Sequence, residues 1–152
     1  MDKPLLLLLP VTNPDENKLE QAYEVAGDIV TTYQGETIQV PKFFQYDGAS
    51  IPPAAWQAIG TPYEPRFMTA AVFHDWLYHT HQLKEQEPTD ELFHELLLQS
   101  GVNEVRAGLM LAAVRLAGGW YWNNDADDDA YLLRLAERIL ADGRDPAEYG
   151  MS

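Results

Sequence analysis

The chain has 152 residues, of which 24 are acidic and 10 are basic, so its net charge is 10 − 24 = −14. At ~100–200 residues per domain, this length predicts a single domain over residues 1–152. The acidic excess argues against nucleic acid as a partner, because a phosphate backbone binds surfaces rich in lysine and arginine. Cysteine is absent, which excludes thiol nucleophiles, thiolate zinc sites and disulfide scaffolds.

The first twenty residues contain one dense apolar run, the five leucines at positions 5–9. Five residues are too few for a membrane span, which needs ~20, and fewer than the ~7–15-residue core of a secretory signal. We interpret the run as a buried strand or a plug of the core, within an N-terminal extension over residues 1–20. We therefore expect no signal peptide and no membrane span.

Residues 23–40 are rich in β-prone side chains, and Gln34-Gly35 divides them where a hairpin turn is expected. Pro41 then ends the second strand or places it at a sheet edge. The next segment, 43–53, contains Gly48, Pro52 and Pro53 and is too rich in residues with special backbone preferences for a regular element. It predicts an irregular loop.

Apolar side chains at 3- and 4-residue spacing predict about four helices in the rest of the chain. The helices are expected at residues 66–81, 89–100, 103–121 and 126–141. Gly101 and Gly143 end the second and the fourth helix, and a C-terminal tail follows over residues 142–152. In the third helix we expect one stripe to face the core, formed by Val105, Leu109, Ala112 and Leu116. The predicted fold class is α+β, predominantly helical, with an N-terminal β-hairpin and an irregular loop before the helices.

An ionisable pair, His74 and Asp75, lies in the middle of the first predicted helix among apolar residues. At ~100° per residue the two side chains point in different directions and face different partners. Tyr78 is one turn on from His74 and shares its face. Two interpretations stay open. The set is a functional site, or His74 is a buried histidine bonded to a carbonyl while Asp75 bonds the backbone of the loop at Gly48.

Asp90 is predicted at the start of the second helix, where the helix dipole favours an acid in the first turn. If the first two helices pack antiparallel, Asp90 instead meets His74 and fixes its tautomer, as an orienting carboxylate does in a catalytic dyad. Asp47, next to Gly48 in the loop, either caps a turn or offers an oxygen to a cation. On the first helix, Asp75 and His79 are four residues apart and could share a metal ion.

The order and spacing of several segments resemble a family known from phages and prophages, called domain of unknown function 1353. The segments are Val40-Pro41, Asp47 to Pro52, His74 to Tyr78, Asp90 with Phe93, and Val114-Arg115 with Gly118 and Trp120. The resemblance covers about residues 20–122. It implies a phage or prophage protein found in the host cytoplasm or the virion.

A second, looser resemblance concerns the chemistry. His-Asp-x-x-Tyr on one helix, followed by an aspartate on the next, is similar to the site of secreted and parvovirus-type phospholipases A2. This resemblance implies a catalytic set in which a histidine base activates water, an aspartate partners it and a tyrosine hydroxyl supports it: His74, Asp90 and Tyr78. It implies Ca²⁺ as the cofactor, with ligands from the first helix and the loop: Asp75, Asp47 and Gly48.

Together these observations predict a calcium-assisted hydrolase that acts on the ester bonds of a lipid or another ester substrate. The alternative is a non-enzymatic phage structural, tail or accessory protein that binds other phage proteins, with a purely structural His-Asp pair. A third hypothesis is a host-interaction protein that uses the charge of −14 to occupy a basic surface of a host protein.

Overall fold

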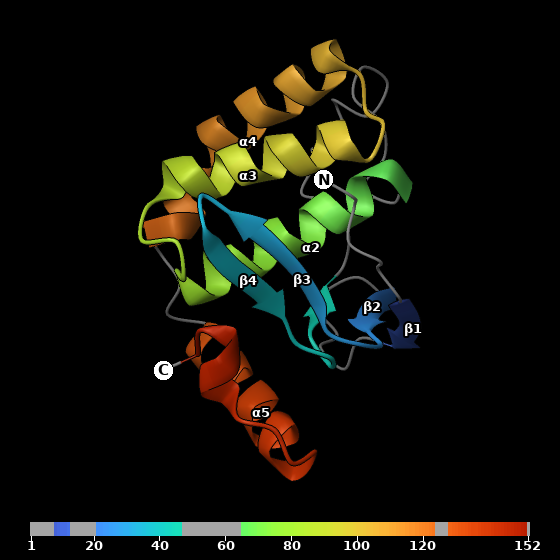
Figure 1. The fold of residues 1–152 in the computed structure, drawn as a ribbon, viewed down its shortest axis with the longest axis vertical. Helices are drawn as coiled ribbons and strands as arrows, with labels where there is room; N and C mark the ends of the chain where they lie inside the picture. Colours follow the sequence, from blue (N-terminus) through green and yellow to red (C-terminus); the bar gives the residue numbers. More distant parts are fainter. Residues whose placement is uncertain (1–7, 13–20, 47–64, 124–127, 152) are drawn as a thin grey trace. The chain divides into compact units, whose positions relative to one another are not determined.

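The computed structural model describes residues 8–12, 21–46, 65–123 and 128–151. They form two compact units, residues 65–123 in one and the remaining segments in the other. Strands precede helices along the chain (Figure 1), and helices predominate, which confirms the predicted α+β class. Two compact units can belong to one folding domain, so the single domain over residues 1–152 stays a prediction, and each unit is described by itself.

The predicted hairpin is confirmed in the β-rich unit. Strands β3 (Ile29–Tyr33) and β4 (Glu36–Val40) pair antiparallel, with Tyr33 opposite Glu36. Gln34 and Gly35 both have positive φ, 49° and 83°, as a type I′ turn requires. Alternate residues of β3 are buried, which is the pattern of a strand with one face on a core.

A second antiparallel sheet has the strand order β1-β2-β5, formed by β1 (Leu8–Thr12), β2 (Gln21–Val25) and β5 (Gln45–Tyr46). Strand β1 belongs to the expected N-terminal extension, so this part of the extension is a sheet strand. The first three leucines of the apolar run, and residues 47–53 of the expected irregular loop, lie outside the described residues.

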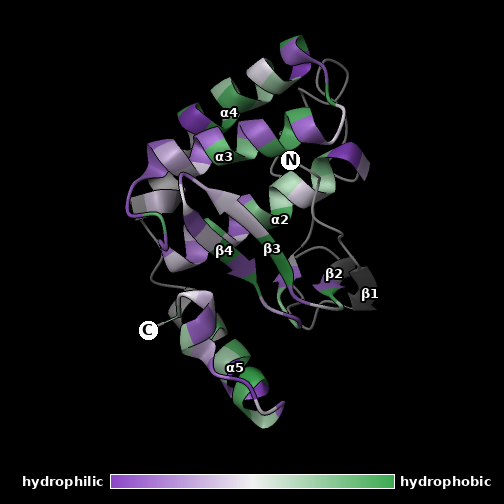
Figure 2. Ribbon diagram, viewed as in Figure 1, coloured by the Kyte–Doolittle hydropathy of each residue, from purple (hydrophilic) through white to green (hydrophobic). Residues whose placement is uncertain are grey.

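The β-rich unit ends with helix α5 (Asp128–Ala141) and the 3-10 helix η2 (Pro146–Tyr149). Polar and apolar residues both colour the α5 ribbon in Figure 2, as expected of a helix with one buried face. Gly143 follows α5 with a φ of 82°, in agreement with its predicted role. The segment that we expected as a tail contains η2, which packs against β4 and α5 and buries Tyr149.

The helical unit consists of α2 (Pro65–Thr80), α3 (Gln86–Gln99) and α4 (Glu104–Asn123). Helix α2 packs against α3, and α3 packs against α4. Large apolar side chains fill its interior: Phe67, Val72, Phe73, Trp76 and Leu77 from α2, and Leu92, Phe93, Leu96 and Leu97 from α3. Among the described residues, each helix is too short or too polar to cross a bilayer.

The prediction of which face of α4 packs against the core is wrong. Val105, Leu109 and Leu116 are 76%, 48% and 89% exposed, and Ala112 is exposed as well. Among the α4 side chains that the structure describes, the buried ones are Ala107 and Met110. Because α4 carries apolar residues on every side, their spacing cannot select the face that packs against α3.

Candidate functional site

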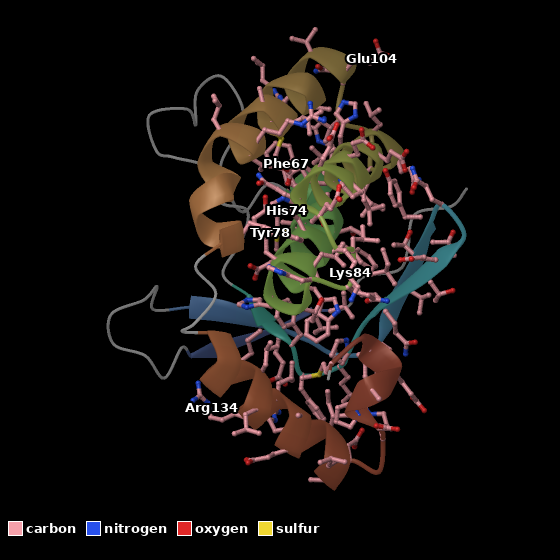
Figure 3. All side chains as sticks on the ribbon, turned by 90° about the vertical axis from the view of Figure 1, so that its left-hand side faces the viewer. Phe67, His74, Tyr78, Lys84, Glu104 and Arg134 are labelled. Carbon is pink, nitrogen blue, oxygen red and sulfur yellow. The ribbon has the colours of Figure 1, made fainter. Side chains whose placement is uncertain are left out.

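The site is built between α2 and α3. His74, in the middle of α2, lies with its Nε2 atom 2.7 Å from Oδ1 of Asp90 on α3. Tyr78, one turn further along α2 (Figure 3), donates its hydroxyl to the same oxygen at 2.9 Å. The structure thus brings together the three residues predicted as the catalytic set, whose roles stay predictions.

Asp90 is completely buried, and both oxygens of its carboxylate form hydrogen bonds. Its second oxygen accepts a hydrogen bond from the side-chain amide of Gln86 at 3.3 Å. Helix α3 begins at Gln86 and not near Thr89 as predicted, so Asp90 lies beyond the first turn, where the helix dipole has little effect. The dipole therefore does not explain this acid, whereas the three hydrogen bonds satisfy a carboxylate that water cannot reach.

Aromatic rings fix the orientation of the His74 imidazole. Its centroid lies 4.4 Å from the ring of Tyr78 and 4.7 Å from the ring of Phe93. Trp122, near the end of α4, packs edge-on against Tyr78 at 5.1 Å. The His74 side chain retains 16% of its surface exposed, so the imidazole is held firmly and still reaches the surface.

The hydrogen bonds also determine which nitrogen of His74 is available. An ionised Asp90 only accepts hydrogen bonds, so Nε2 donates and the lone pair of a neutral imidazole lies on Nδ1. No residue that the structure describes forms a hydrogen bond with Nδ1. Burial, the hydrogen bond to Asp90 and the charge of Asp90 all raise the pKa of Tyr78, so its hydroxyl remains a donor. The arrangement can accept a proton at Nδ1.

The predicted metal ligands are only partly described. Asp75 lies on another side of α2, with its side chain 44% exposed and Oδ1 3.7 Å from Nε2 of His79. Over residues 8–12, 21–46, 65–123 and 128–151, no three His, Asp or Glu side chains converge in a way that could hold a metal ion. Asp47 and Gly48 lie outside these residues.

Two members of the cluster were missed by the sequence reasoning. Gln86 could have been found, because it lies four residues before Asp90 and so shares its helix face. The contact between Trp122 and Tyr78 joins residues 44 positions apart (122 − 78), and no local pattern indicates it.

The fold and the cluster define an α+β protein with a histidine, a tyrosine and a buried aspartate linked between two adjacent helices. Over residues 23–114, which is 92 of 152 residues, the chain matches the family described as "Protein of unknown function (DUF1353)". The chain belongs to this family, as the sequence resemblance indicated. The matched region includes all three residues of the cluster.

Two curated relatives are found in Sinorhizobium fredii (strain NBRC 101917 / NGR234). The chain is 36% identical over 80 residues to "Uncharacterized protein y4iH", which is 53% of this chain and 33% of the relative. It is 34% identical over 79 residues to "Uncharacterized protein y4jT", which is 52% of this chain and 23% of the relative. The matches thus span a third or less of these relatives. No solved structure matches the chain significantly.

Proposed function

We propose that this protein is a hydrolase in which His74 activates a water molecule for attack on an ester carbonyl. The observation that supports the proposal best is the 2.7 Å hydrogen bond between Nε2 of His74 and Asp90. An aspartate in this position holds the imidazole in one tautomer and stabilises the imidazolium that forms when the base takes a proton. The spacing of these residues, similar to that of the phospholipases A2, supports the same assignment.

In the proposed reaction, the water oxygen bonds to the carbonyl carbon while one water proton passes to Nδ1 of His74. The bond from that carbon to the alcohol oxygen then breaks, and the imidazolium returns the proton to the departing alkoxide. Asp90 stabilises the positive charge between these two steps. Tyr78 keeps the Asp90 oxygen aligned through its own hydrogen bond.

Calcium, with Asp75 as a ligand, remains what the phospholipase resemblance implies. Calcium takes oxygen ligands, and within the described residues no group of three His, Asp or Glu side chains forms around Asp75, while Asp47 and Gly48 lie outside those residues. No step of the proposed reaction is therefore routed through the ion.

The proposal is tested with a short-chain p-nitrophenyl ester and with phosphatidylcholine vesicles, each with calcium and with a chelator. His74→Asn should lower the hydrolysis rate at least ~100-fold, because general-base catalysis contributes about 10²–10⁴-fold. His94→Asn, a histidine on α3 outside the cluster, is the matched control and should keep the wild-type rate. A folded His74→Asn variant with full activity would contradict the proposal.

A second candidate is a non-enzymatic phage or prophage protein in which the cluster only ties α2 to α3. The complete burial of Asp90 and its set of bonded partners favour this candidate. It predicts no hydrolysis, together with a loss of about 1–3 kcal/mol in the His74→Asn variant, because buried polar groups lose a partner. Genes for tail or head proteins on either side of this gene would support it.

A further inference from the structure

The outer face of α4 is apolar and exposed. Four residues at spacings of 4, 3 and 4 form its stripe: Val105, Leu109, Ala112 and Leu116. This spacing is typical of the seam between two packed helices. The opposite side of α4, at Ala107 and Met110, is already buried, so the stripe is a second packing face of the same helix.

The stripe has a hollow at one end and a projection at the other. A shallow depression is lined by Asn103, Glu104, Val105, Arg106 and Leu109. Leu116 projects from the far end of the stripe, with 89% of its surface exposed. At 1.5 Å per residue, the eleven positions from Val105 to Leu116 separate hollow and projection by ~16 Å along the helix.

We propose that a second copy of this chain covers this face, with α4 packed antiparallel against α4 of the other copy. Along α4, the point halfway between residues 105 and 116 is also halfway between residues 109 and 112. A single two-fold axis through this point therefore places residue 116 of one copy opposite residue 105 of the other, and residue 109 opposite residue 112. Leu116 of each copy then enters the depression at Val105 of the other, and Leu109 packs against the small Ala112. A two-fold interface needs such a self-complementary surface.

Charge favours the same orientation. Glu104 and Arg115 are both exposed, and at ~100° per residue they lie about 20° apart around α4, on one side of the stripe. Glu104 is the first residue of α4 (Figure 3). Antiparallel pairing brings Glu104 of each copy near Arg115 of the other. Parallel pairing in register would instead place the two Glu104 side chains on opposite sides of the seam, each far from Arg115 of the other copy.

The first test is sedimentation equilibrium of the full chain at ~0.15 M salt, which screens the charge of −14 on each copy beyond about 8 Å. The wild type should be a dimer, and Leu116→Glu should be a monomer. Leu133→Glu is the matched control, because Leu133 is an exposed leucine on α5 outside the stripe, and it should remain dimeric. A monomeric wild type at about 100 μM, or a dimeric Leu116→Glu variant, would overturn the proposal.

The second test measures orientation and remains informative if Leu116→Glu fails to fold. The chain has no cysteine, so Val105→Cys and Leu116→Cys each introduce a single thiol. A short bismaleimide should cross-link a mixture of the two variants and neither variant alone, because like positions lie ~16 Å apart in the antiparallel pair. Cross-linking of each variant with itself would overturn the antiparallel arrangement.

The third test uses charge reversal. Glu104→Arg should weaken the dimer, because two arginines then meet at each end of the seam. The double variant Glu104→Arg/Arg115→Glu should restore it. Failure of the second substitution to rescue the first would contradict the proposed ion pairs.

Discussion

The two units of this protein each contain an aspartate that accepts a hydrogen bond from a tyrosine hydroxyl, but the two carboxylates are held in different ways. In the helical unit, Tyr78 donates to Asp90 at 2.9 Å. In the β-rich unit, Tyr149 donates to Asp28 at 2.7 Å. Asp90 is completely buried, whereas the Asp28 side chain keeps 28% of its surface exposed.

The remaining partners differ in charge. Asp28 forms an ion pair with Arg144 at 2.8 Å and also accepts hydrogen bonds from the Lys42 backbone and the Gln39 side chain. These contacts tie the β3–β4 hairpin to the segment around η2, and the guanidinium neutralises the carboxylate. Asp28 therefore has the surroundings of a structural ion pair.

The side chains that hydrogen-bond to Asp90 within the described residues are His74, Tyr78 and Gln86, and none is permanently charged. The nearest group that can carry a compensating positive charge is the imidazole itself. This contrast shows how a carboxylate that orients a histidine differs from one that locks a fold. Under the proposed function, Asp90 orients His74, and the imidazole that accepts the proton is the group that carries the positive charge.

The largest difference in stability between the two sites is expected when each aspartate is replaced by alanine. Asp90→Ala removes a completely buried carboxylate that accepts hydrogen bonds from three part-buried donors, so we expect the free energy of unfolding to fall by about 3–5 kcal/mol. Asp28→Ala should lower it by only about 1–2 kcal/mol, because water can reach the groups that lose their partner. Urea unfolding of both variants measures the difference. A larger loss for Asp28→Ala would contradict our description of the two sites.

The next prediction concerns the stability of the protein at low pH. Burial raises the pKa of Asp28, but the hydrogen bonds from Lys42, Tyr149 and Gln39 and the charge of Arg144 outweigh burial and lower this pKa below its ordinary value of 3.8. A lowered pKa contributes stability above the unfolded-state value, and this contribution is lost as the pH falls through the folded-state value.

We therefore expect the unfolding free energy of the wild type to fall between about pH 5 and pH 2, and Asp28→Asn to reduce this fall. Urea unfolding at a series of pH values gives both curves. Parallel curves for wild type and Asp28→Asn would show that Asp28 does not carry the acid sensitivity.

Sequence reasoning predicted the parts that depend on local spacing. The hairpin turn at Gln34-Gly35 was predicted from its place between two β-prone runs, and the positive φ of both residues confirms it. The contact of His74 with Asp90 required one further assumption, that neighbouring helices pack antiparallel.

The parts that could not be predicted depend on contacts between residues far apart in the sequence, or on apolar patterns that do not indicate which face of a helix is buried. Arg144 and Tyr149 meet Asp28 across 116 and 121 residues. On α4, apolar residues on all sides gave no direction, and the stripe through Leu109 was assigned to the core although it is exposed. The early start of α3 was missed because Pro88, which we expected before the helix, lies in its first turn, where proline is tolerated.

A smaller loss of stability is expected when the tyrosine that donates to each aspartate is replaced by phenylalanine. Tyr78→Phe removes one donor to Asp90 but keeps the ring that packs against His74, so the unfolding free energy should fall by about 1 kcal/mol. Tyr149→Phe removes a donor to Asp28 and an acceptor for Arg144. Asp28 and Arg144 stay paired with each other and partly exposed to water, so this substitution should cost less. Urea unfolding of the two variants in parallel tests the order, and equal losses would contradict it.

The smallest effect separates the hairpin turn from the Asp28 ion pair. Gln34 adopts a φ of 49°, which asparagine tolerates better, so Gln34→Asn should raise the unfolding free energy by about 0.5 kcal/mol. Gln34→Val should lower it by about 1 kcal/mol, because a β-branched side chain is strained at positive φ. Asp28 and Gln34 lie at opposite ends of β3, more than ~10 Å apart at 3.3 Å per residue, so Gln34→Asn should give the same gain in an Asp28→Asn background. A gain that disappears in that background, measured by urea unfolding of all four proteins, would show that the turn and the ion pair act as one unit.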